Sequence, residues 1–166
     1  MVNDWTTERT KVFKAIRSIE IERWKLLKVV DVMRKEMVTV DEGASVAEAS
    51  KIMREKGEGG AIVLRKGTLI GMMTERDVTY KVAANGLDAR IVKVAEIMET
   101  PLITVDPHTD LGDAAKLMDE HQIRRLAVVS KGILLGVLSA IDIARNLEKY
   151  AADETRKILR YAFFVR

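Results

Sequence analysis

The chain has 166 residues, a formal net charge of +3 and no cysteine, and 48% of its residues are hydrophobic while 32% are charged. This composition predicts a soluble globular protein of one domain or two small ones, and it excludes disulfides, thiolate zinc sites and a cysteine nucleophile. Because His108 and His121 are the only histidines, a histidine-based metal site or proton relay is not expected either.

Residues 1–28 are predicted to form an N-terminal helical extension. Apolar side chains recur along one face of this stretch, at Phe13, Ile16, Trp24 and Leu27. Neither a signal-peptide core nor a run of about 18 apolar residues occurs in the sequence, so we expect a cytoplasmic protein without a membrane partner. Residues 1–28 and 144–166 each carry a net charge of +3 and the stretch between them −3, so any nucleic-acid contact is expected from the two ends.

Residues 29–90 read as a βαββα repeat. A short extended stretch over residues 38–40 precedes Ser45, and Glu48 stands three residues later, as in a capping box at a helix start. The helix that follows places apolar residues at a spacing of three and four, at Val46, Ala49, Ile52 and Met53. Two apolar strands, over residues 61–65 and 68–73, then flank a Lys-Gly turn, and a last helix begins near Val78.

Residues 91–147 repeat this pattern. A shift of 65 positions places residues 31–78 on residues 96–143 without a gap, and 14 of the 48 pairs are identical. The last helix of this copy begins near Ile143, and residues 148–166 continue as a C-terminal helical extension. Because a unit of about 50 residues cannot cover its own apolar faces, we expect the two copies to pack as one α/β (α+β) domain with pseudo-two-fold symmetry and a cleft shared by their strand-to-helix turns.

A hydroxyl and a carboxylate three residues apart follow the last strand of each copy. They are Thr74 and Asp77 in the first copy, and Ser139 and Asp142 in the second. Each pair fits a helix cap, since both groups satisfy free N–H groups and suit the helix dipole. The same groups also suit a nucleotide, because a carboxylate accepts hydrogen bonds from a ribose diol. Both interpretations remain open from the residues alone.

The complete signature, Gly71-x-x-Thr-x-x-Asp and Gly136-x-x-Ser-x-x-Asp, resembles that of tandem CBS (cystathionine β-synthase) domains, which together form a Bateman module. Val30-x-x-Met33 at the start of the first copy, a similar start over residues 94–98, and Thr-Val before the first helix of each copy strengthen the resemblance. It covers about residues 29–147 and implies CBS repeats over 29–90 and 91–147.

The resemblance also implies two ligand sites, because in this family the Asp holds a ribose, the Thr or Ser lies beside it and adenine lies between aliphatic side chains. One site is expected to combine residues of both copies, namely Ser139, Asp142, Arg124, Arg125, Val38, Thr39 and Gly59. The other is expected to combine Thr74, Arg76, Asp77, Ile103, Thr104 and Ile123. The arginines are candidates for phosphate binding, and the alternative is that they are solvated surface charges.

The resemblance therefore predicts a regulatory sensor without catalytic residues, metal or required cofactor, which binds AMP, ADP, ATP, NAD or S-adenosylmethionine. Dimerisation through helices and an effector protein in another chain are further expectations. A second hypothesis is a structural or oligomerisation module that docks on an enzyme or transporter. A third is a nucleic-acid-binding regulator that uses the basic terminal helices, and it ranks last because neither a helix-turn-helix nor a zinc-ribbon pattern occurs.

Overall fold

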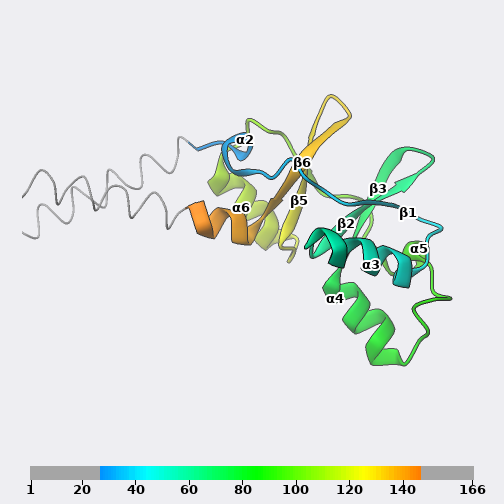
Figure 1. The fold of residues 1–166 in the computed structure, drawn as a ribbon. Coiled ribbons are helices and arrows are strands. Elements are labelled where there is room, and N and C mark those ends of the chain that lie inside the picture. Colours follow the sequence, from blue (N-terminus) through cyan, green and yellow to red (C-terminus); the bar gives the residue numbers. More distant parts are fainter. Residues whose placement is uncertain (1–26, 147–166) are drawn as a thin grey trace, which may run out of the picture. The chain divides into compact units, whose positions relative to one another are not determined.

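The computed structural model describes residues 27–146. The extensions predicted over residues 1–28 and 148–166 thus fall outside the described residues, except for residues 27 and 28. Repeat 1 (residues 29–90) contains α2 (Val29–Val32), β1 (Thr39–Asp41), α3 (Val46–Lys56), β2 (Gly60–Arg65), β3 (Thr68–Thr74) and α4 (Glu75–Asp77), which continues as a π turn (Val78–Val82) and a 3₁₀ turn (Ala83–Asn85) (Figure 1). Repeat 2 (residues 91–147) contains α5 (Val94–Ile97), β4 (Thr104–Val105), α6 (Leu111–Glu120), β5 (Arg125–Ser130), β6 (Ile133–Ser139) and a helix over residues 140–146.

Each repeat contributes one three-stranded sheet. The strand orders are β1-β2-β3 and β4-β5-β6. The short strands β1 and β4 pair in parallel with β2 and β5, whereas β2 and β3 form an antiparallel hairpin. Two such sheets with their helices confirm the predicted mixed α/β class. The helix after each hairpin begins three residues earlier than predicted, at residues 75 and 140.

The Lys-Gly turns at the tips of the two hairpins are confirmed. Both turn residues have positive φ in each repeat, 49° and 81° for Lys66 and Gly67, and 49° and 79° for Lys131 and Gly132. Two successive residues with positive φ are typical of a type I′ turn, whose twist matches that of the flanking strands. The turn residues therefore determine where each hairpin reverses.

Helix α3 begins at the predicted capping box. The hydroxyl of Ser45 accepts a hydrogen bond from the backbone N–H of Glu48 at 3.2 Å, and the Glu48 carboxylate accepts one from the backbone N–H of Ser45 at 2.9 Å. Gly57 ends the helix in the left-handed conformation with φ 66°, which costs glycine little because it has no Cβ.

The apolar face of α3 is narrower than predicted. Val46, Ala49 and Met53 are buried and pack in one core cluster with residues of β2, β3 and α5. Ile52, predicted to share this face, is 40% exposed. At 100° per residue Ile52 stands at the edge of the stripe, well away from Val46, so the prediction for this residue was wrong.

The segment that precedes the first strand of each repeat bonds to the other repeat. The backbone N–H of Val29 donates to the carbonyl of Thr109 at 2.9 Å, and the equivalent N–H of Val94 donates to that of Ala44 at 3.0 Å. Isolated β-bridges also connect each of these segments to the other repeat, and they pair Arg34 with Val137 and Glu99 with Met72. Neither repeat is therefore complete without the leading segment of the other.

Packing divides the described residues into two compact units that differ from the repeats. One contains residues 27–33, 106–126 and 138–146, and the other contains Arg34–Val105 and Ala127–Val137. Each unit thus combines residues of both repeats, as the exchanged segments require. The repeat boundaries given above stay a prediction. Within residues 27–146, no helix is long and apolar enough to cross a membrane.

The first prediction concerns Gly71 of the signature. A Cβ at this position would stand 2.5 Å from the backbone carbonyl oxygen of Glu99, so we expect Gly71→Ala to lower the free energy of unfolding by about 1–3 kcal/mol. Gly112 in α6 has open space around it, and Gly112→Ala is expected to raise that free energy by about 0.5 kcal/mol. Urea denaturation measures both, and equal shifts in the two variants would contradict the close approach at Gly71.

Candidate functional site

In repeat 1, the carboxylate of Asp77 folds back onto the end of β3. Its Oδ2 accepts hydrogen bonds from the backbone N–H of Thr74 at 2.8 Å and from the Thr74 hydroxyl at 2.7 Å. Thr74 has extended backbone angles and the helix begins at the next residue, so the change from strand to helix brings the two side chains together. Asp77 is only 6% exposed.

Repeat 2 builds the same pair with a serine. Asp142 Oδ2 accepts hydrogen bonds from the backbone N–H of Ser139 at 3.1 Å and from its hydroxyl at 2.5 Å. The Ser139 hydroxyl in turn accepts one from the backbone N–H of Asp142 at 3.2 Å. Both residues are 7% exposed. The predicted capping role is thus present in both repeats.

A second contact recurs beside each pair. The backbone N–H of Glu75 donates to the carbonyl of Gly59 at 3.3 Å, and the equivalent N–H of Ala140 donates to the carbonyl of Arg124 at 3.0 Å. The residue before β2 and the residue before β5 are therefore each hydrogen-bonded to the first residue of the helix that follows the hairpin of the same repeat. Gly59 lies beside the Thr74 pair of its own repeat, and its predicted assignment to the site of Ser139 stays a prediction.

The candidate phosphate-binding arginines differ in exposure. Arg76 is exposed, and its guanidinium lies 5.4 Å from the centre of the Tyr80 ring. Arg124 is exposed and Arg125 is half-buried. Because Arg76 is exposed, its guanidinium is accessible from solvent while it contacts the Tyr80 ring.

The residues predicted to contact adenine lie at the starts of the strands. Val38 is buried in the core cluster, and its carbonyl accepts from the backbone N–H of Ile62 at 2.9 Å. Ile103 is half-buried, and its carbonyl accepts from Ala127 at 3.3 Å. The other members of this set are Thr39 and Thr104, which are exposed, and Ile123, which is half-buried.

Lys81 is a charged neighbour of the site that the sequence interpretation missed. Its ammonium lies 3.1 Å from Asp77 Oδ1, donates to the backbone carbonyl of Ile97 at 2.7 Å and donates to Glu99 Oε1 at 2.5 Å. Burial alone would lower the pKa of Lys81, but the hydrogen bonds to Glu99 and Asp77 outweigh burial and raise the pKa above its ordinary value. The spacing of four residues between Asp77 and Lys81 was the available signal.

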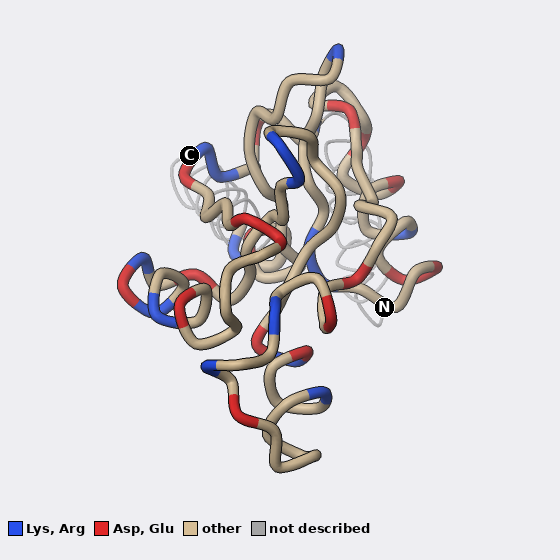
Figure 2. The backbone as a smooth tube through the Cα atoms, turned by 90° about the vertical axis from the view of Figure 1, so that its right-hand side faces the viewer, with Lys and Arg blue, Asp and Glu red and all other residues tan. Residues whose placement is uncertain are grey.

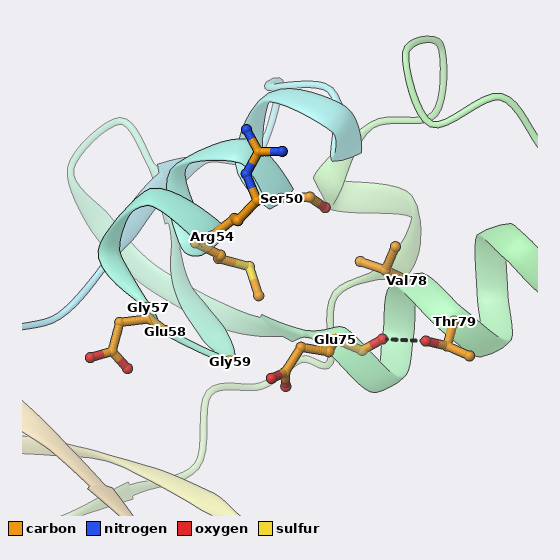
Figure 3. A pocket seen from close by; sticks show the side chains of 9 residues that line it. Ser50, Arg54, Gly57, Glu58, Gly59, Glu75, Val78 and Thr79 are labelled. Carbon is orange, nitrogen blue, oxygen red and sulfur yellow. Dashed lines mark hydrogen bonds between the residues drawn. The ribbon is translucent and has the colours of Figure 1, made fainter.

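A pocket of about 380 Å³ adjoins the repeat 1 pair (Figure 3). It lies between α3, the turn after α3 and the start of α4, and Gly59 and Glu75 contribute to its wall. Figure 3 shows the hydroxyl of Thr79 donating to the backbone carbonyl of Glu75, a hydrogen bond of 2.9 Å. The full lining consists of Ser50, Met53, Arg54, Gly57, Glu58, Gly59, Glu75, Val78 and Thr79.

Charges of both signs are interspersed along the described backbone (Figure 2). Most of the excess positive charge belongs to residues 1–28 and 144–166, of which the structure describes only residues 27, 28 and 144–146. The nucleic-acid hypothesis therefore stays a prediction. Within residues 27–146, no group of three histidine, aspartate or glutamate side chains is arranged to hold a metal ion.

Comparison with known proteins identifies both repeats. The family model of the CBS domain matches residues 29–84 and 94–149. The chain is 36% identical over 118 residues to the CBS domain-containing protein YhcV of Bacillus subtilis (strain 168). This alignment covers 71% of the chain and 84% of YhcV. It is 32% identical over 122 residues to Hypoxic response protein 1 of Mycobacterium tuberculosis (strain CDC 1551 / Oshkosh), and the alignment covers 73% of this chain and 85% of that protein. Among solved structures, a hexameric CBS-CP12 protein from bloom-forming cyanobacteria aligns with a TM-score of 0.69 at 33% identity, covering 82% of this chain and 87% of that one.

The hydroxyl of Thr74 gives the second prediction. Thr74→Val keeps the shape of the side chain but removes the donor to the buried Asp77 carboxylate, so we expect the free energy of unfolding to fall by about 1–2 kcal/mol. Thr74→Ser is the matched control and should stay near the wild type, because Ser139 makes the same contact in repeat 2. Urea denaturation measures both variants. A valine variant as stable as the serine variant would show that the hydroxyl contributes nothing.

Proposed function

Because this chain belongs to the CBS domain family and contains the domain as a tandem pair, we propose that it is a non-catalytic regulatory protein that binds an adenosine-containing ligand. The ligand class comprises AMP, ADP, ATP, NAD and S-adenosylmethionine. The protein that responds to the ligand is a separate chain. CBS-pair proteins are in general regulatory, ligand-binding modules, and the adenosine ligand is the specific part of the proposal.

The observation that carries the proposal is the repeated hydroxyl and carboxylate pair at the two strand ends. Asp77 and Asp142 are almost completely buried, yet both are charged side chains, and a buried carboxylate is retained only where hydrogen bonds stabilise it. Thr74 and Ser139 orient the two carboxylates in the same way. A ribose diol presents two O–H donors, which is the chemistry that an oriented carboxylate accepts.

The remaining proposed contacts supply the phosphate and base interactions. The guanidiniums of Arg76, Arg124 and Arg125 suit phosphate oxygens. The aliphatic and backbone groups proposed for the base are Val38, Thr39, Gly59, Ile103, Thr104 and Ile123. Because repeat 1 has Gly59 where repeat 2 has Arg124, we expect the two sites to differ in affinity for phosphorylated ligands.

The lengths of the relatives support a regulatory module over an enzyme. The matched region accounts for 84% of YhcV and 85% of Hypoxic response protein 1. Little of either relative therefore lies outside the segment that matches this chain. The sequence also contains no Ser-His-Asp set, P-loop or carboxylate cluster for a metal.

The third prediction tests ligand binding directly. Isothermal titration of the full chain with AMP, ATP and S-adenosylmethionine should show binding of at least one of them. Asp142→Ala and Asp77→Ala should each weaken that binding at least tenfold at their own site, because the ribose loses a charged acceptor worth about 1.5–3 kcal/mol.

The exposed Asp119 in α6 supplies the matched control, and Asp119→Ala should bind like the wild type. Asp142→Asn and Asp77→Asn keep the volume of the side chain, and circular dichroism establishes whether each variant is folded. Absence of binding by the folded wild type to every adenosine compound would reject the sensor and favour the structural or docking role.

Self-association through helices is the second part of the proposal. Large apolar side chains are exposed on helical segments of both repeats, with Ile52 at 40%, Tyr80 at 61% and Ile141 at 59% exposure. Exposed apolar side chains mark a protein contact where they form a contiguous patch, and we propose that helical residues such as these form one. The similar CBS-CP12 protein is hexameric. These observations support a homodimer or a larger homo-oligomer.

Sedimentation velocity tests this fourth prediction. The wild type should sediment as a dimer or larger, and Ile52→Glu should raise the dissociation constant at least tenfold because it places a charge in an apolar contact. Ile91, which lies outside the helices and is 74% exposed, provides the control Ile91→Glu. A monomeric wild type, or equal effects of both substitutions, would contradict a helix-mediated contact.

A further inference from the structure

We propose that Lys81 competes with the ribose of the ligand for Asp77, and that it thereby sets the affinity of the repeat 1 site. The inference rests on the proposed function, since it assumes that Asp77 accepts hydrogen bonds from a ribose. It assigns a specific role to a residue outside the Gly-x-x-Thr-x-x-Asp signature. Lys81 would act as a built-in competitor whose ammonium is linked covalently to the site.

The first argument is a count of acceptor positions on Asp77. A carboxylate offers about four lone-pair positions. Thr74 uses two of them through its backbone N–H and its hydroxyl, both on Oδ2, and the Lys81 ammonium forms an ion pair with Oδ1 at 3.1 Å. The two remaining positions are on Oδ1, the oxygen that the ammonium contacts, and a ribose diol that donates two hydrogen bonds needs both. The diol must therefore displace Lys81 or bind with one hydroxyl alone.

The second argument is that Lys81 is firmly held. The Lys81 ammonium donates to the carbonyl of Ile97 and to Glu99 Oε1, and it forms an ion pair with Asp77 Oδ1. A lysine is charged at neutral pH, and the contacts of Lys81 raise its pKa further. Because the side chain is 37% exposed, water can still replace the protein contacts, so displacement by a ligand costs affinity but does not require unfolding.

The third argument comes from the duplication. The residue of repeat 2 that corresponds to Lys81 is Asn146, and its side-chain amide donates to the backbone carbonyl of Asp142 at 2.9 Å. The position equivalent to Lys81 thus carries an amide in repeat 2. Because asparagine occurs at this position in repeat 2, Lys81→Asn is the substitution that tests the role of Lys81.

The alternative role for Lys81 is a direct contact with a phosphate, and it has the opposite sign. If Lys81 binds phosphate, its removal weakens binding of AMP. If it competes for Asp77, its removal strengthens binding of any ligand that carries the diol. Adenosine separates the two roles because it has the diol and no phosphate.

The experiment isolates the repeat 1 site in the full chain. Adenosine is titrated into the Asp142→Ala variant and into the Asp142→Ala/Lys81→Asn double variant. We expect Lys81→Asn to tighten adenosine binding about tenfold, as one charge-assisted hydrogen bond at Asp77 is released for the diol. Binding of 2′,3′-dideoxyadenosine, which lacks the diol, should not change.

Lys116 provides the matched control, because it is an exposed lysine in α6 whose ammonium lies 3.6 Å from Glu120 four residues away. Lys116→Asn in the same background should leave adenosine affinity unchanged. Lys81→Gln is the second variant if Lys81→Asn does not fold, as judged by thermal melting.

Unchanged or weaker adenosine binding after removal of Lys81 would overturn the inference and leave the proposed function intact, provided that Asp77→Ala abolishes the binding. An equal gain for dideoxyadenosine would also overturn it, because the gain would then not involve the diol. If the wild type binds no adenosine compound, the proposed function and this inference both fail.

Discussion

A carboxylate that is removed from water has to be hydrogen-bonded, and this requirement shapes the chain at the end of each hairpin. Asp77 and Asp142 are nearly inaccessible, and each is satisfied by the backbone N–H and the hydroxyl of the residue three positions earlier. The contact forms only if the strand stops and the helix starts within that interval. The same geometry therefore ends the strand, caps the helix and aims a charged acceptor.

The segment that precedes the first strand of each repeat bonds to the other repeat, and these contacts fix the surroundings of the strand ends. Residues 92–95 bond to residues 42–46, and Glu99 pairs with Met72 of β3. Close approach at this point requires Gly71, which belongs to the same signature as Thr74 and Asp77. Lys81 adds a charged link from Asp77 to Ile97 and Glu99. Asp77 and the segment that leads into repeat 2 thus contact the same ammonium.

Local features were predictable from the sequence because they depend on few residues. The hairpin turns follow from the Lys-Gly pair in each copy, and the capping box follows from Ser45 and Glu48. Ile52 was misplaced because a periodic pattern shows where an apolar face is centred but not how wide it is. The edge of that face is decided by which neighbours cover it.

Contacts at long range in the sequence were harder to predict, and the candidate site contains several. The hydroxyl and carboxylate pairs were identified from their spacing alone, whereas the partners of Lys81 at Ile97 and Glu99 are 16 and 18 residues away. Only its contact with Asp77 had a local signal. The exchanged segments were missed for the same reason, since a repeat read by itself does not show which copy it bonds to. How the residues of the two repeats combine into a ligand site stays a prediction.

Duplication gives two strand ends with the same carboxylate pair but with different charged neighbours. The carboxylate and its hydroxyl are constrained by folding, so both copies keep them, while neighbouring positions are free to diverge. Repeat 1 has Lys81 beside Asp77, and it has Gly59 before its central strand. Repeat 2 has Asn146 at the position of Lys81 and Arg124 at the position of Gly59. Under the proposed function, a cation beside the carboxylate would oppose the ribose, whereas a cation at the start of the central strand would favour a phosphate. The proposal therefore predicts that the two repeats differ in which part of a nucleotide they bind most strongly, although their folds match.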